Sequence, residues 1–243
     1  MFSKKEEIDD PKNAEEQVLS LVGREIHEAF FKNYTKKQWG VDPKELDASV
    51  TARIPVRFND DDRYVGDKFQ AMPLEGYHKL FEKMLNGIEV YLSTDFKDIK
   101  NKIFYDRLIY TGPIDEFFDY KYGRLPYRSL NFKFDNYNKE FYQDWSQINY
   151  PNDNDFTRIV EIKHATGQKI ANTTITKEYP VSDGDPFYPI PAKDNFKLYY
   201  KYRNDADGLK NVYFVGRLAQ YKYLNMDQVV KEALDLFGLL KNG

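Results

Sequence analysis

The segment that decides the fold is Phe30-Phe31-Lys32-Asn33-Tyr34-Thr35-Lys36-Lys37-Gln38-Trp39-Gly40, which ends an amphipathic helix with four aromatic side chains. Phe30 and Tyr34 are one helical turn apart and therefore share a face. Two rings at that spacing can form one wall of a slot for a flat ligand such as a nucleobase. An aromatic pair on a helix is more commonly part of a core or an interface. Trp39 precedes Gly40, a residue type that commonly ends helices.

Residues 11–35 predict the helix that leads into this segment. Pro11 suits its first turn, Glu15 and Glu16 suit its positive end, and apolar residues recur at helical spacing through Phe30. Beyond Trp39, the proline at position 55 opposes a long helix, so Arg53 is expected on an irregular stretch or loop.

The rest of the chain alternates short helical and extended patterns. Helices are expected at 75–86 and 226–240, with strands at 88–92, 103–110 and 211–215. Between 113 and 205, Asn, Asp, Gly and Pro clusters separate strand-like runs at 129–134, 147–150, 157–163, 173–179 and 197–202. This pattern predicts an antiparallel sheet. Asn225 is a candidate N-cap of the last helix, with Gln228 as its capping-box partner.

Composition excludes several classes of site and partner. The 243 residues carry 36 basic and 39 acidic side chains, so the near-balanced charge favours neither nucleic acid nor a polybasic membrane patch. The absence of cysteine excludes disulfides, zinc-thiolate sites and thiol nucleophiles. Three scattered histidines argue against a histidine-centred metal site. The apolar runs are too short to span a membrane and the first residues have no signal-peptide core, so a cytoplasmic protein is expected. The 20 tyrosines and 18 phenylalanines are compatible with nucleotide-sugar binding.

The segment 30–40 resembles the uridine-binding helix of the UDP-galactopyranose mutase family, whose members interconvert UDP-galactopyranose and UDP-galactofuranose. Further segments match in family order over nearly the whole chain. They are Thr51-Ala52-Arg53-Ile54-Pro55-Val56-Arg57 with Asp62-Arg63-Tyr64, Tyr110 to Asp115, Tyr127-Arg128-Ser129-Leu130, Asn149-Tyr150-Pro151 with Thr157-Arg158, and Gly216-Arg217-Leu218-Ala219 with Tyr223 to Gln228.

The resemblance implies an α+β fold in four parts. A helical UDP-binding domain would cover 1–74, and a partial FAD-domain segment would cover 75–112. An antiparallel sheet domain would cover 113–208, and a C-terminal strand and helix, 209–243, would return to the Rossmann-like FAD domain.

The resemblance also implies a set of site residues. Arg53 and Arg158 would form a clamp on the diphosphate, as the catalytic positioning pair. Without the resemblance, Arg53 is a solvated surface arginine, and Arg158 could equally pair with a nearby Asp or Glu. The substrate would contact Phe30, Phe31, Tyr34, Thr35, Trp39, Tyr64, Arg128, Asn149, Tyr188, Tyr223 and Asn225. The cofactor FAD would contact Arg217, Met226, Asp227 and Gln228. No metal is implied.

Two departures from the family pattern stand out. Asn225 occupies a position where the family usually carries aspartate. The chain also has no G-x-G-x-x-G, the fingerprint that cradles the FAD pyrophosphate, so it is expected to begin after that motif.

The expected function is therefore that of the mutase or its larger part, in which reduced flavin forms an adduct with the sugar through N5. The products would serve cell-surface polysaccharide synthesis. The alternatives are an inactive UDP-sugar-binding fragment and, more remotely, a glycan-binding domain. The chain alone is expected to purify colourless. Its oligomeric state is left open, a homodimer being usual among bacterial relatives.

Overall fold

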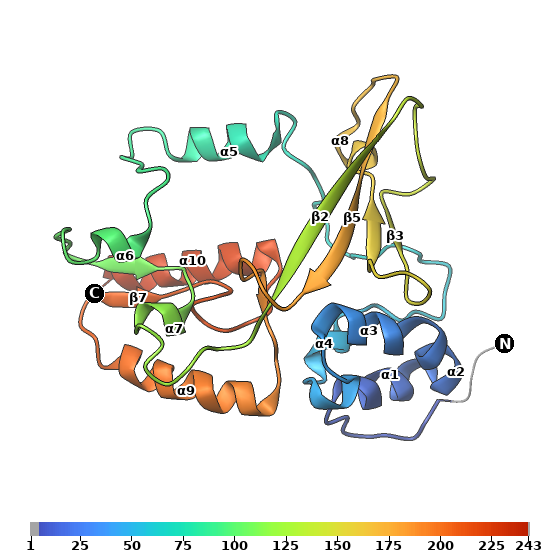
Figure 1. Ribbon diagram of the computed structural model, residues 1–243, viewed down its shortest axis with the longest axis horizontal. Coiled ribbons are helices and arrows are strands. Elements are labelled where there is room, and N and C mark those ends of the chain that lie inside the picture. Colours follow the sequence, from blue (N-terminus) through green and yellow to red (C-terminus); the bar gives the residue numbers. More distant parts are fainter. Residues whose placement is uncertain (1–4, 243) are drawn as a thin grey trace.

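The computed structural model, which describes residues 5–242, places a lobe of short helices beside a tall antiparallel sheet (Figure 1). A second group of helices and two short strands lies on the other side of that sheet. This mixture of helices and antiparallel strands confirms the α+β expectation.

The first lobe begins with α1, whose N-cap Asn13 accepts a hydrogen bond from the amide of Glu16 at 2.9 Å. A single helix over 11–35 is wrong, because Gly23 adopts a positive φ of 77° and interrupts it. A π-helical turn follows, and Gly40, at φ 72°, ends the run in the left-handed region. The elements of the lobe are α1 (Ala14–Val22), α2 (Arg24–Ile26), η1 (His27–Phe31), α3 (Lys32–Trp39), η2 (Pro43–Glu45) and α4 (Ser49–Ala52).

The large sheet has the strand order β3-β4-β5-β2-β6, and every neighbouring pair is antiparallel. Its long strands β2 and β5 rise together in Figure 1. Four of the five extended runs expected from the sequence are confirmed in this sheet or at its edge. The strands are β2 (Tyr127–Tyr137), β3 (Gln147–Asn149), β4 (Arg158–Val160), β5 (Thr173–Val181) and β6 (Tyr188–Pro189), with α8 (Lys163–Thr166) after β4.

The strand expected at 197–202 is wrong, because this stretch belongs to α9 (Lys193–Asp207). Its tyrosines have high strand propensity. However, the buried residues Tyr199, Tyr202 and Ala206 recur at helical spacing and pack into a core. Tertiary burial of this helical stripe overrides the local preference.

That core lies beneath a two-stranded parallel sheet formed by β1 (Leu108–Tyr110) and β7 (Val212–Phe214). Tyr110 and Phe214 pack there with side chains from α7 (Ile114–Phe117) and α9. The last helix, α10 (Met226–Asn242), lies beside the two strands in Figure 1 and confirms the helix expected at 226–240.

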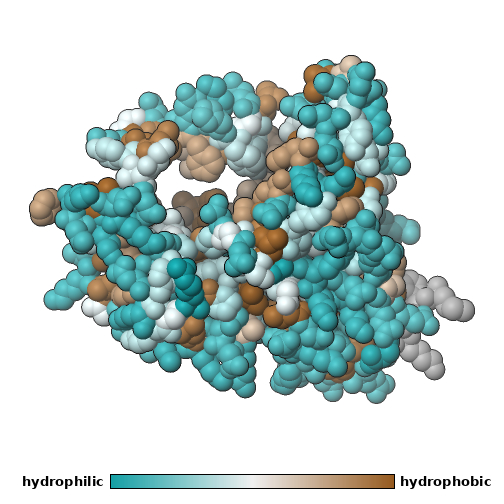
Figure 2. All heavy atoms as spheres, viewed as in Figure 1, coloured by the Kyte–Doolittle hydropathy of each residue, from teal (hydrophilic) through white to brown (hydrophobic). Residues whose placement is uncertain are grey.

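The segment between α4 and β1 stands away from the rest of the chain in its middle part, whereas Phe96, near its end, packs against the core beside β1 (Figure 1). It contains α5 (Gly76–Met84), which confirms the helix expected there, and α6 (Phe96–Ile99). In Figure 2 an opening separates α5 from the elements that lie below it in this view. The strand expected at 88–92 is wrong, because this stretch has no neighbouring strand in the described part of the chain with which to pair. Among residues 5–242, no helix is both long enough and apolar enough to cross a bilayer.

Candidate functional site

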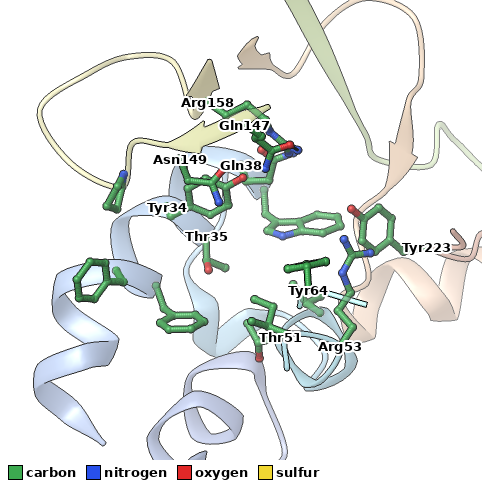
Figure 3. A pocket seen from close by; sticks show the side chains of 16 residues that line it. Tyr34, Thr35, Gln38, Thr51, Arg53, Tyr64, Gln147, Asn149, Arg158 and Tyr223 are labelled. Atoms are coloured by element: carbon green, nitrogen blue, oxygen red, sulfur yellow. Dashed lines mark hydrogen bonds between the residues drawn. The ribbon is translucent and has the colours of Figure 1, made fainter. Parts of the chain in front are cut away.

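A cavity of about 290 Å³ lies where α3 meets the hairpin formed by β3 and β4 (Figure 3). Tyr34, Arg53 and Arg158, which the sequence predicts to converge, all line it although they are widely separated in the chain. The lining residues are Phe30, Phe31, Tyr34, Thr35, Gln38, Trp39, Val50, Thr51, Arg53, Ile54, Tyr64, Gln147, Asn149, Pro151, Arg158 and Tyr223.

One wall comes from the π-helical turn and α3. The wider π turn carries Phe30 and Phe31, and such turns occur frequently at functional sites. Tyr34 follows on α3 and points into the cavity, as does Asn149 on β3 (Figure 3). Burial raises the pKa of Tyr34, so its hydroxyl is a neutral hydrogen-bonding group at physiological pH. The wall therefore offers ring faces and a polar tip to a planar ligand.

A cluster of three aromatic rings closes one end of the cavity. Trp39 is buried and contacts Tyr188 and Tyr223 edge-on, with ring centroids 5.2 and 5.1 Å away. The Gln38 amide donates a hydrogen bond to the Tyr188 hydroxyl. Tyr188 is thus in the supporting layer behind Trp39 rather than in the lining.

Arg158, on β4, is held by residues of the two neighbouring strands, β3 and β5. Its Nε lies 3.0 Å from a carboxylate oxygen of Glu178, its register partner on β5, and its Nη1 donates to Gln147 Oε1 at 3.4 Å. Burial raises the pKa of Glu178, while the nearby Arg158 opposes that rise. Burial also disfavours the Arg158 cation, but the acidic groups around it, including the Glu178 carboxylate, outweigh burial and leave the Arg158 pKa raised. Arg158 is consequently a fixed, charged guanidinium at the cavity wall.

Arg53 approaches from the opposite side of the cavity (Figure 3). It caps the short helix α4, which agrees with the irregular stretch expected there. Its guanidinium lies 4.3 Å from the ring centroid of Tyr223, and Nη1 donates to the Asn225 side chain at 3.3 Å. Because the residue is exposed, Arg53 is held more loosely than Arg158.

Arg128 lies outside the cavity lining. It is buried and donates to the backbone oxygens of Lys37 and Gln38 at 3.2 and 3.0 Å, and to Ser182 Oγ at 2.7 Å. These carbonyls belong to the last turn of α3, which has no helical partners for them. Arg128 therefore fixes the end of the helix that carries the cavity wall.

The residues that were expected to contact FAD also lie outside the lining of the cavity. Arg217 donates to the backbone oxygens of Phe187 and Leu224. Met226, Asp227 and Gln228 form the exposed first turn of α10. Gln228 accepts a hydrogen bond from the Asn225 amide at 2.8 Å, which is one half of the expected capping box.

Gln38, Gln147 and Glu178 were missed by the sequence reasoning. Gln147 precedes Asn149 by two residues, so the period of a strand would have placed both on one face. Gln38 follows Tyr34 by one helical turn and could have been found in the same way. Glu178 depends on the register of β4 against β5, which no local pattern indicates.

Comparison with known proteins identifies the family. The family model for UDP-galactopyranose mutase matches residues 29–223. A Klebsiella pneumoniae protein named "Probable UDP-galactopyranose mutase" is 42% identical over 234 residues, which cover 93% of this chain and 60% of the relative. The dTDP-fucopyranose mutase of Escherichia coli is 38% identical over 240 residues, which cover 94% of this chain and 64% of the relative.

A crystal structure of reduced UDP-galactopyranose mutase has the same fold, with a TM-score of 0.60 at 14% identity, over 97% of this chain and 70% of that one. The chain spans less than two thirds of the length of the curated relatives it matches. Because the family model covers residues 29–223, most of the sequence, the chain belongs to the UDP-galactopyranose mutase family.

Proposed function

We propose that the cavity binds the uridine diphosphate of a UDP-sugar and that the chain is the substrate-binding part of a UDP-galactopyranose mutase. The reaction would interconvert UDP-galactopyranose and UDP-galactofuranose. The observation that carries the proposal is the arrangement of Tyr34, Arg53 and Arg158 around one cavity. A base-stacking wall and two guanidinium groups are the chemistry that a nucleoside diphosphate requires.

The ligand would lie along the cavity with its base at the α3 wall. Phe30 and Tyr34 would stack on the uracil, and the Asn149 amide, which offers a donor and an acceptor, would read its edge. Phe31 and Thr35 complete that end of the cavity.

The diphosphate would lie between Arg158 and Arg53, with the hydroxyls of Tyr64 and Tyr223 nearby and Trp39 beside the sugar. Arg53 would close over the diphosphate by leaving Asn225, to whose side-chain oxygen it donates in this structure. The two cations would stabilise the negative charge of UDP when its bond to the sugar breaks.

The described residues fit FAD only in part. The first turn of α10 is exposed, and Arg217 is fixed close by through two backbone oxygens, so this edge could meet a flavin ring. A cradle for the cofactor's pyrophosphate is not among residues 5–242, which contain no G-x-G-x-x-G. Reduced flavin, when bound, would supply the nucleophile for the sugar. The residues of this chain would hold and orient UDP, and no step through the flavin is derived from them.

The parallel pair β1 and β7, with α10, supports a further part of the proposal. Parallel sheets are normally larger and covered on both faces. We therefore assign 75–112 and 209–243 to a Rossmann-like FAD domain, 1–74 to the helical UDP-binding domain and 113–208 to the sheet domain. The alternative function is an inactive UDP-sugar-binding fragment.

The test is calorimetric titration of the purified chain with UDP and, separately, dTDP, together with a visible absorption spectrum. We expect UDP to bind and the protein to be colourless. Tyr34→Ala should weaken UDP binding by about 5- to 150-fold, the range that loss of one base-stacking ring produces. The control is Tyr91→Ala, which removes an exposed tyrosine that does not line the cavity.

Absence of UDP binding would contradict the proposal. Preference for dTDP would move the assignment toward the activity of the Escherichia coli relative. Flavin bound at unit occupancy would contradict the inference that the described residues fit FAD only in part, and it would favour an active mutase.

A further inference from the structure

Lys37 joins the two elements between which the cavity lies. It stands on α3 between Tyr34 and Trp39 but is absent from the lining. Its Nζ donates to the backbone oxygens of Tyr150, Asn154 and Phe156 at 2.6, 2.8 and 3.1 Å. An ammonium group has three N–H donors, so all of its hydrogen-bonding capacity is used on the loop between β3 and β4.

This arrangement is unusual for a lysine in the last turn of a helix. The neighbouring Lys36 is exposed, and its side chain makes no hydrogen bond or ion pair with the described residues 5–242, as is common for this residue type. The Lys37 ammonium is partly buried against neutral carbonyl oxygens, and burial lowers its pKa while Asp155 and Asp153 in the same loop oppose that change. Ordering a long lysine side chain costs rotamer freedom, which opposes the contact. The contact therefore has to stabilise the loop position by more than that cost.

The loop that Lys37 holds presents ligand-facing residues. Asn149 and Arg158 are register partners at its base, and Pro151 lies within it; all three line the cavity. A second tie runs from Asn33 to Asn152, whose side chain also donates to a backbone oxygen in the π turn. The hairpin is thus fastened to the helix that carries the opposite wall.

The helix is itself fixed, so the lysine can act as a spacer. Arg128 on β2 binds the backbone oxygens of residues 37 and 38, while the Lys37 side chain extends to the hairpin. The β4 strand is held independently by its pairing with β5. Loss of Lys37 should therefore move the loop and Asn149 more than Arg158.

We propose that Lys37 is a positioning residue that sets the spacing between α3 and the β3–β4 hairpin, and through it the selectivity of the site for its base. This inference rests on the proposed function for the identity of the ligand. The contact that carries it, three hydrogen bonds from one ammonium to one loop, does not depend on that identity.

Lys37→Met keeps the length of the side chain and removes its charge and donors. We expect UDP affinity to fall by about 10-fold or more, since a displacement of about 1 Å at a site can cost a factor of 100. Affinity for inorganic pyrophosphate should stay within about twofold, because Arg53 and Arg158 remain in place, and the preference for UDP over CDP should decrease. Lys37→Arg, which keeps donors and charge, should recover part of both UDP affinity and selectivity.

The matched control is Lys36→Met, which makes the same change on the adjacent exposed residue. Wild-type affinity and selectivity in Lys37→Met would overturn the inference. An equal loss for UDP, CDP and pyrophosphate would also overturn it, because that pattern reports general destabilisation. If Lys37→Met does not fold, Lys37→Gln is titrated instead under the same criteria.

A readout without ligand separates this inference from the proposed function. If the wild-type protein does not bind UDP, the proposed function fails and amide hydrogen exchange of residues 150–157 decides the inference. Faster exchange there in Lys37→Met than in Lys36→Met would support the positioning role, and equal exchange would refute it.

Discussion

The junction between α3 and the sheet differs sharply from the surface formed by α5, the 88–107 segment and α10. At the junction, buried or partly buried partners hold the residues that support the cavity, such as Arg128 and Arg158. On the other surface, large apolar side chains are exposed, among them Met84, Leu234 and Phe237, each more than 60% exposed. The chain thus builds the cavity from its own residues and leaves the second surface without a cover among the described residues.

The apolar surface follows a regular pattern. Val230, Leu234 and Phe237 recur along one face of α10, which is the stripe that a helix normally packs against a core. An exposed apolar patch of this kind is typical of an interaction surface or of a protein that aggregates. The comparison therefore predicts that substitutions on the apolar face of α10 alter self-association but leave UDP affinity unchanged. Substitutions at the junction between α3 and the sheet should alter UDP affinity and leave self-association unchanged.

The largest expected effect comes from replacing Leu234 and Phe237 together with glutamate. We expect the wild-type chain to self-associate at micromolar concentration and the double variant to shift toward monomer. Each apolar side chain removed from a contact is worth about 1.5–3 kcal/mol, or roughly a factor of 10 to 100 in association. Sedimentation velocity over a concentration series measures the change.

The control for this double variant is Lys231→Gln with Lys241→Gln, which lowers the net charge by the same amount on α10 without removing apolar surface. UDP affinity should be equal in all three proteins. A wild-type chain that stays monomeric throughout the series would contradict the prediction, as would a control that dissociates equally well.

The next effect distinguishes the two arginines of the clamp. Arg158→Ala should weaken UDP binding by roughly 100-fold and Arg53→Ala by roughly 10-fold, within the range for lost charge-assisted hydrogen bonds. The difference arises because Arg158 is fixed between Glu178 and Gln147, while Arg53 is exposed and must be ordered by the ligand. Titration calorimetry with UDP gives both values.

Arg158→Ala also leaves the partly buried Glu178 without its cation, so the double variant Arg158→Ala with Glu178→Gln is needed as a control. It should be more stable than Arg158→Ala and equally weak in binding UDP. Recovery of UDP affinity in the double variant would show that Arg158 acts on stability alone. Wild-type UDP affinity in both Arg158→Ala and Arg53→Ala would contradict the proposal that the two arginines hold the diphosphate.

The sequence predicted most of the cavity because its residues occur in segments with a recognisable order. Tyr34, Arg53 and Arg158 were placed by resemblance, and all three line the cavity. The role of Arg128 could not be foreseen, since its partners are backbone oxygens of α3, 90 residues earlier in the chain. The strand expected at 197–202 failed for a related reason: burial of Tyr202 against Phe118 and Tyr122 is a long-range contact that decides between helix and strand.

The smallest expected effect is a pH dependence at the base of the helical lobe. His27 is 2% exposed on the π turn that leads to the cavity wall, and neither ring nitrogen makes a hydrogen bond within the described structure. Burial lowers the pKa of His27 below its usual 6.5, although Glu15 opposes the change. The unfolded chain therefore takes up a proton below about pH 6.5 that the folded protein resists, and folding stability decreases as the pH falls. The loss levels off below the folded pKa, and each unit of pKa lowering corresponds to about 1.4 kcal/mol.

His27→Leu should remove this component, so that urea midpoints change less between pH 7 and pH 5 than in the wild type. His78→Leu, which replaces an exposed histidine on α5, should retain the wild-type slope. Parallel midpoint curves for wild type and His27→Leu would show that the imidazole is protonated equally well in both states. In the predicted outcome, acid lowers the folding stability of the protein through His27, on the π turn that leads to the cavity wall.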